Sequence, residues 1–166
     1  MLTARAPRPY ERDETDAQRL DRNYAEQLQE LRVAQTGLQI LFAFLLTIAF
    51  QQRFATLSSV QRGLYVATLV SATVSAALFI APVAAHRVFF RRRLKEELVT
   101  FTGRMAALGL VLLALTMLGA VLLIVDFVSG AVAAWIITGA LGFLFLVLWF
   151  LLPYRLKDSS RPDPPE

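Results

Sequence analysis

Two glutamines stand inside the first strongly apolar stretch of the chain, four residues apart. Gln35 and Gln39 share one face of a helix, and Arg32 projects in nearly the same direction. An amide that faces hydrocarbon leaves its donors and acceptors without partners, so we expect this face to meet protein. The partner stays open: another helix of the same bundle, a second copy, a different membrane protein, or a polar path for ions or protons.

A single carboxylate breaks the long apolar second half of the chain. Asp126 is the only acidic residue between Glu97 and Asp158. It is expected at the C-terminal end of a helix, where a negative charge opposes the helix macrodipole. We therefore predict a compensating contact, either as a cap on the following helix or as an ion pair with Arg53 or Arg62. An ion-binding role is the alternative, although a proton-coupled transporter usually carries an ionisable group deep in a span.

Four basic residues gather between the second and third apolar blocks: Arg91, Arg92, Arg93 and Lys95. Such a cluster orients the neighbouring spans and attracts anionic lipid headgroups, by about 1 kcal/mol for each basic residue near the surface. The segment matches no nucleic-acid-binding motif. We therefore expect membrane lipids, and not nucleic acid, as the partner of this cluster.

The sequence contains no pattern typical of a catalytic or metal centre. It has no cysteine and a single histidine, His86, with no second metal ligand near it. It also lacks GxSxG, HExxH and a phosphate-cradling glycine-rich loop. Nucleophilic and general acid–base catalysis are left without their usual groups. We predict a protein that is not an enzyme and holds no metal or cofactor.

Four apolar blocks must position these residues. The chain of 166 residues is 56% hydrophobic and only 18% charged, and a helix needs about 20 apolar residues to cross a bilayer. We place the spans at about 31–50, 60–85, 105–125 and 131–152. They form one membrane domain, 15–152, between disordered tails at 1–14 and 153–166. Small residues four apart, such as Ser71 and Ser75, favour close helix contacts.

An amphipathic helix is predicted ahead of the first span. Thr15 and Gln18 resemble a capping box, and no helix breaker follows. An apolar stripe runs along one face of this segment: Leu20, Tyr24, Leu28 and Leu31. We expect this stripe to contact a partner protein or the membrane surface.

The distribution of basic residues sets the expected topology. If residues 31–50 cross the membrane, 15 of the 17 basic residues fall on one side and 2 on the other. Without that crossing the division is 8 against 9. Because basic residues concentrate in cytoplasmic segments, the first arrangement is strongly favoured. It places both termini in the cytoplasm.

Several short segments of the chain resemble the signatures of a known family. They are Leu28–Gly37, Gln51–Phe54, Ile80–Pro82, His86–Arg87 and Phe90–Arg93. The family consists of uncharacterised four-span integral membrane proteins from actinobacteria, a domain of unknown function, and the resemblance covers residues 16–152. It implies a bacterial plasma-membrane location, and the family has no assigned catalytic residues. Some relatives carry a sodium/proton antiporter label.

The sequence therefore predicts an all-α fold. We expect an integral membrane four-helix bundle whose N-terminal cytoplasmic amphipathic helix is continuous with the first span. The leading functional hypothesis is a scaffold or accessory protein that associates with itself or with another membrane protein. The alternative is a small oligomeric ion or proton transporter that uses Gln35, Gln39 and Asp126.

Overall fold

The structure is a computed structural model that describes residues 15–89, 95–152 and 155. It contains four long helices: α1 (Asp16–Ile48), α2 (Ser59–Phe89), α3 (Lys95–Ser129) and α4 (Ala131–Leu146). A short 3-10 helix, η1 (Gln52–Thr56), joins α1 to α2, and a π-helical turn, η2 (Val147–Leu151), follows α4. The described residues include no β-strand, so the prediction of an all-helical chain is confirmed.

The first helix is uninterrupted from the capping box to the end of the first apolar block. Thr15 is its N-cap: the Thr15 hydroxyl accepts from the Gln18 N–H at 3.3 Å, and Gln18 Oε1 accepts from the Thr15 N–H at 2.9 Å. The helix has 33 residues, which corresponds to about 50 Å. The two segments predicted from the sequence are thus a single helix.

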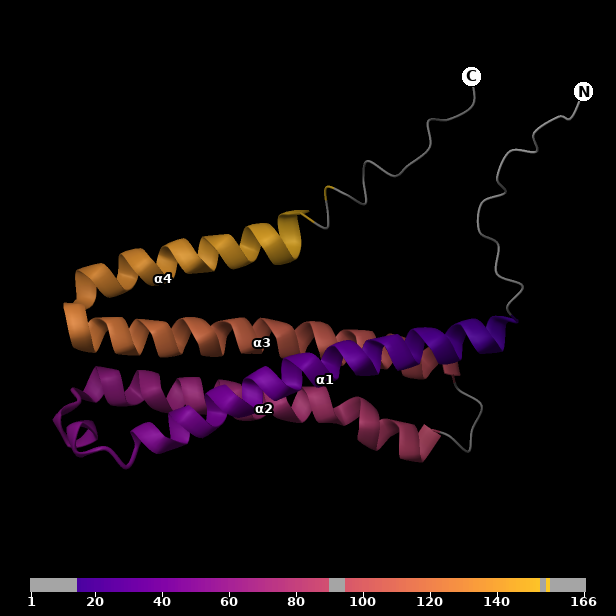
Figure 1. Cartoon of the computed structure of the whole chain (residues 1–166), viewed down its shortest axis with the longest axis horizontal. Coiled ribbons are helices and arrows are strands. Elements are labelled where there is room, and N and C mark those ends of the chain that lie inside the picture. Colours follow the sequence, from indigo (N-terminus) through magenta and orange to yellow (C-terminus); the bar gives the residue numbers. More distant parts are fainter. Residues whose placement is uncertain (1–14, 90–94, 153–154, 156–166) are drawn as a thin grey trace, which may run out of the picture.

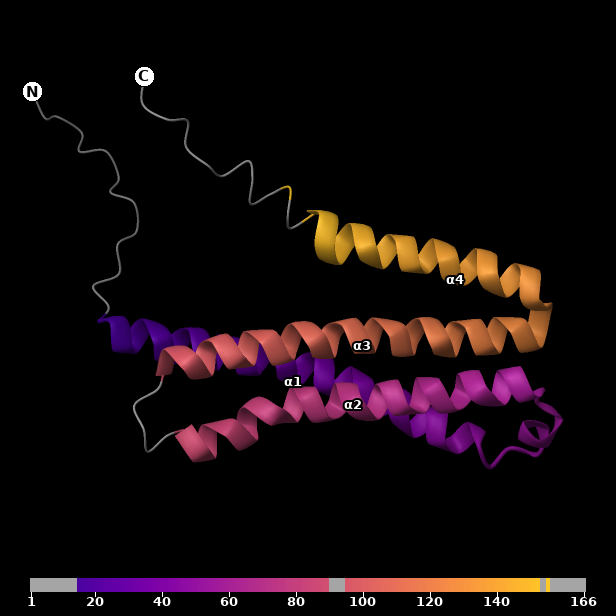
Figure 2. The ribbon, with the colours of Figure 1, turned by 180° about the vertical axis from the view of Figure 1, so that it is seen from behind.

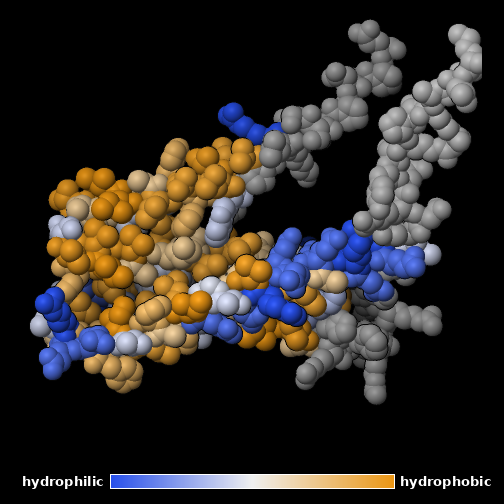
Figure 3. Space-filling model, viewed as in Figure 1, coloured by the Kyte–Doolittle hydropathy of each residue, from blue (hydrophilic) through white to orange (hydrophobic). Residues whose placement is uncertain are grey.

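The described part of the chain has four helical segments that are long and apolar enough to cross a membrane, and the fourth continues from α4 into η2. These segments are Asp21–Ile48, Ser59–Ala85, Leu98–Ser129 and Ala131–Trp149. Apolar surface covers much of the molecule, and polar surface gathers over the N-terminal part of α1 and at the opposite end near η1 (Figure 3). This distribution suits a membrane location. Polar surface also continues along α1 into the apolar region.

Helices α2 and α3 form the central pair, with α1 crossing one face of it and α4 packed mainly against α3 (Figures 1 and 2). The start of α1 lies at one end of the bundle, and η1 and the α3–α4 turn lie at the other. From that turn α4 runs back and diverges from α3. The arrangement has the alternating directions expected of four successive crossings.

The core is built where α1 meets the central pair. Leu31, Leu38 and Leu45 recur every seven residues on α1, and each is at most 5% exposed. They pack in one cluster with Ala72 and Phe79 of α2 and with Ala120 of α3. Seven residues are close to two helical turns, so residues with this spacing lie on one face of the helix and can all contact the neighbouring helices.

Small residues let α2 and α3 approach closely. The Ser75 hydroxyl donates to the Gly109 carbonyl at 2.8 Å, and the Ser71 hydroxyl donates to the Leu112 carbonyl at 3.1 Å. A Cβ at Gly109 would lie 2.5 Å from the Phe79 ring. The spacing of Ser71 and Ser75 seen in the sequence thus coincides with a helix contact of the predicted kind.

One residue connects the last two helices. Gly130 lies between α3 and α4 with φ 85°, a conformation that L side chains rarely adopt. Its N–H donates to the Asp126 carbonyl at 3.0 Å. Behind the turn, Ala134 is fully buried, and Gly142 faces Leu118. The predicted spans leave residues 126–130 between them, and the connection in the structure is shorter because α3 continues to Ser129.

Candidate functional site

The polar face predicted on the first span lies at the surface of the bundle. We call it the polar strip: Arg32, Gln35 and Gln39. Arg32 and Gln39 are exposed, and Gln35 is half-buried at the flank. Each of Arg32 and Gln39 follows a core leucine by one residue, which turns it by about 100° from the core stripe. In the part of the chain that the structure describes, neither glutamine side chain forms a hydrogen bond with another residue.

The apolar stripe that precedes the first span makes contacts within the molecule at Leu31 and Tyr24. Leu31 is only 5% exposed and belongs to the core cluster. The Tyr24 hydroxyl donates to the carbonyl of Pro82 in α2 at 3.2 Å, and Leu28 is half-buried. Because α1 is continuous, its core-facing stripe simply extends toward the N-terminus. Leu31 and Tyr24 thus contact the bundle, while the contact of this stripe with a partner protein or the membrane surface stays a prediction; the Leu20 side chain lies outside the described residues.

Asp126 has a compensating contact, but not the one expected. Its Oδ2 accepts from Gln61 Nε2 at 2.7 Å. Among the described residues it forms no ion pair with Arg53 or Arg62. It does not cap the following helix either, because the N-cap of α4 is Gly130 and no side chain forms a cap hydrogen bond there. The capping box of α2 fixes the position of the Gln61 side chain, because its Oε1 accepts from the Ser58 N–H at 3.0 Å.

The structure does not join Asp126 to the polar strip. The Asp126 side chain accepts from Gln61 of α2 near η1. Gln35, which is half-buried, and Gln39, which is exposed, lie nearer the N-terminal end of α1. A continuous path through these groups is therefore absent from the described part of a single copy. Arg91, Arg92 and Arg93 fall outside the described residues, as does the side chain of Lys95, so the predicted headgroup contact stays a prediction.

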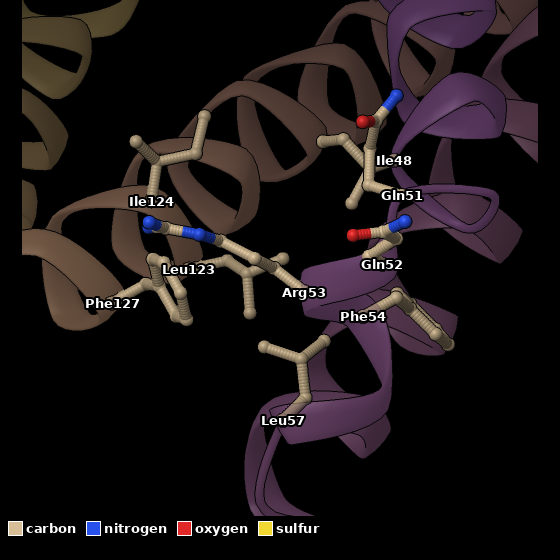
Figure 4. A pocket seen from close by; sticks show the side chains of 9 residues that line it. All are labelled: Ile48, Gln51, Gln52, Arg53, Phe54, Leu57, Leu123, Ile124 and Phe127. Atoms are coloured by element: carbon tan, nitrogen blue, oxygen red, sulfur yellow. The ribbon is translucent and has the colours of Figure 1, made fainter.

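A pocket at the η1 end of the bundle was not predicted. It has a volume of about 440 Å³ and lies between the end of α1, η1 and the last turns of α3. Figure 4 shows the nine side chains that line it: Ile48, Gln51, Gln52, Arg53, Phe54, Leu57, Leu123, Ile124 and Phe127. One feature of the sequence pointed to this region of the chain. Residues Gln51–Phe54 form one of the segments that resemble a family signature, but spacing alone does not reveal which helix they face.

No metal centre is apparent in the described ranges, where no group of three or more His, Cys, Asp or Glu side chains could hold an ion. The fold is that of a four-helix protein with the lengths and apolar surfaces of a membrane bundle. The chain belongs to a family of unknown function, DUF6328, whose model matches residues 13–153. No curated protein matches the chain, and no solved structure does.

Proposed function

We propose that this protein is a non-enzymatic scaffold or accessory protein of the bacterial plasma membrane. It crosses the bilayer four times with both termini in the cytoplasm, and it associates with a second copy or another membrane protein through the polar strip of α1. The asymmetric distribution of basic residues supports the orientation.

The exposure of Gln39 carries this proposal. The residue lies within the membrane-length segment Asp21–Ile48, yet it is exposed on the surface of the bundle. In lipid, such an amide has no water to bond. Contact with polar groups of a neighbouring helix satisfies it, and interhelical hydrogen bonds of this kind contribute about 0.6–2 kcal/mol each. The position of the strip on the outer face favours an intermolecular neighbour.

The alternative, a small oligomeric transporter, would need several copies to place their polar strips around one path. The described residues place no carboxylate at the polar strip for proton coupling, because Asp126 lies at the η1 end and accepts a hydrogen bond from Gln61. The two functions predict different consequences of the same substitution. Transport requires flux through the purified protein, whereas association alone does not.

The experiment combines Gln35→Leu and Gln39→Leu in one variant. We expect its complexes, extracted in mild detergent and weighed by native mass spectrometry, to fall to the mass of the single chain. Thr36→Val is the matched control, because Thr36 is exposed at the same depth but its hydroxyl donates to the Arg32 carbonyl of its own helix at 2.9 Å. It should leave the complexes intact.

Ion flux in proteoliposomes separates the two functions. The scaffold proposal predicts that the unsubstituted protein gives the same sodium and proton flux as empty vesicles. Flux that disappears in the Gln35→Leu, Gln39→Leu variant would instead establish transport. Complexes of unchanged mass in that variant would contradict association through the polar strip.

A further inference from the structure

The pocket at η1 exists because η1 is anchored toward α2 and leaves a gap toward α3. The Phe54 ring stacks edge-on against Tyr65 of α2, with 5.0 Å between ring centroids. The Tyr65 hydroxyl in turn donates to the Leu45 carbonyl in the last turn of α1, at 2.9 Å. These contacts hold η1 against α1 and α2. Opposite them, Leu123, Ile124 and Phe127 of α3 form a second, apolar wall.

Polar groups lie at the rim of this pocket. Arg53 extends across it toward Ile124 and Phe127, while Gln51 and Gln52 lie on the opposite side (Figure 4). The Arg53 guanidinium carbon is 5.9 Å from the centroid of the Phe127 ring, a cation–π contact. All three polar side chains are exposed.

Arg53 has no internal counter-ion in the described part of the chain. The nearest acidic residue in the neighbouring helix, Asp126, accepts from Gln61 instead. An ionised guanidinium presents several donors in a fixed fork, which matches the oxygens of a phosphate in a bidentate geometry. The Arg53 guanidinium is therefore available to bind an anion from outside the chain.

The remainder of the lining is apolar and adjoins surface that the bilayer would cover. Ile124 is 52% exposed and Phe127 41% exposed, so the apolar wall continues from the pocket onto the outer surface of α3. A small inorganic anion would leave this wall uncovered. An amphiphile with an anionic head and an apolar chain would satisfy both parts.

We propose that this pocket binds an anionic phospholipid from the membrane leaflet at the η1 end. Its phosphate contacts Arg53, with the amides of Gln51 and Gln52 as further donors, and its acyl chain lies along Leu123, Ile124 and Phe127. The volume of about 440 Å³ falls within the roughly 300–1,000 Å³ typical of ligand pockets. The site is separate from the polar strip and does not depend on it.

The test uses the full-length protein in detergent, titrated with short-chain phosphatidylglycerol and followed by native mass spectrometry. Arg53→Gln should lower the affinity for the first bound lipid by about tenfold or more, since a charge-assisted hydrogen-bond pair is lost. Arg62→Gln is the matched control, because Arg62 is an exposed arginine at the same end that does not line the pocket. It should bind as the unsubstituted protein does.

A second variant tests the same site while keeping Arg53. Ile124→Glu places a carboxylate beside the guanidinium and should displace the lipid. It changes the net charge by one unit, as the control Arg62→Gln does. Phosphatidylcholine of equal chain length should bind more weakly than phosphatidylglycerol, and millimolar inorganic phosphate should not displace the bound lipid.

Three outcomes would overturn the proposal. Equal losses in Arg53→Gln and Arg62→Gln would mean a general surface charge effect. Displacement by inorganic phosphate would mean a simple anion site. Lipid binding that survives both Arg53→Gln and Ile124→Glu, in variants with unchanged helical circular dichroism, would place the lipid elsewhere.

Discussion

At the scale of single residues, Gln61 joins two helix ends. Its Oε1 accepts from the Ser58 N–H and completes the cap of α2, and its Nε2 donates to Asp126 near the end of α3. One side chain thus satisfies an N-terminal backbone donor and a carboxylate that the helix macrodipole disfavours. The pairing replaces the ion pair expected from the sequence.

This double contact gives a direct prediction for Gln61→Glu. The carboxylate still accepts in the capping box, but it can no longer donate to Asp126 and instead faces a like charge. We expect a loss of about 1–3 kcal/mol in the free energy of unfolding, measured by denaturation in detergent. Adding Asp126→Asn restores a donor and should recover much of the loss. A double variant no more stable than Gln61→Glu would exclude the proposed contact.

The residues of the candidate site show what sequence can supply. The spacing of Gln35 and Gln39 placed them on one face, and that face is fixed by helix geometry alone. Which way the face points depends on where the stripe of Leu31, Leu38 and Leu45 packs, and that is a tertiary property. The pocket could not be predicted from the sequence, because Arg53 and Phe127 are far apart in the chain and meet only when η1 folds beside α3.

At the scale of elements, the four apolar blocks predicted the four helices, but not their ends. The third helix begins at Lys95, about ten residues before the predicted span. Charged residues at 95–97 and Arg104 mark the limit of apolar composition, whereas helical hydrogen bonding continues through them. A span boundary read from hydropathy is therefore not a helix boundary.

Contact between α2 and α3 leads to a prediction for Gly119. A Cβ there would overlap the Thr68 hydroxyl of α2. Gly119→Ala should therefore destabilise the protein by about 1–3 kcal/mol in thermal unfolding. Thr68→Ala removes the obstructing atom and loses only a bond within its own helix, to the Leu64 carbonyl at 2.8 Å, so the double variant should regain stability.

The control for this pair is Gly139→Ala in α4. No atom lies within 4 Å of a Cβ at Gly139, and alanine favours a helix over glycine by about 0.5–1 kcal/mol. We expect no loss of stability. If Gly119→Ala behaves like Gly139→Ala, close contact between α2 and α3 at this level does not occur.

At the scale of the whole molecule, the helices run alternately, so η1 and the α3–α4 turn share one end. The absence of cysteine in the chain allows this arrangement to be mapped with single introduced thiols. In intact cells, a membrane-impermeant thiol reagent should label Thr56→Cys and Ser129→Cys. Arg155→Cys should react only after lysis. Labelling of all three in intact cells, or of Arg155→Cys alone, would contradict four crossings with a cytoplasmic C-terminus.

The central claim is that the polar strip of α1 contacts protein in the membrane. The most direct measurement places a photo-crosslinking amino acid at Gln39 in native membranes, and separately at Ile40. Ile40 has nearly the same depth and is 56% exposed, but it points about 100° away around the helix. We predict a crosslink from position 39 to a second copy or to another membrane protein, and mainly lipid adducts from position 40. Lipid adducts alone from both positions would contradict the claim.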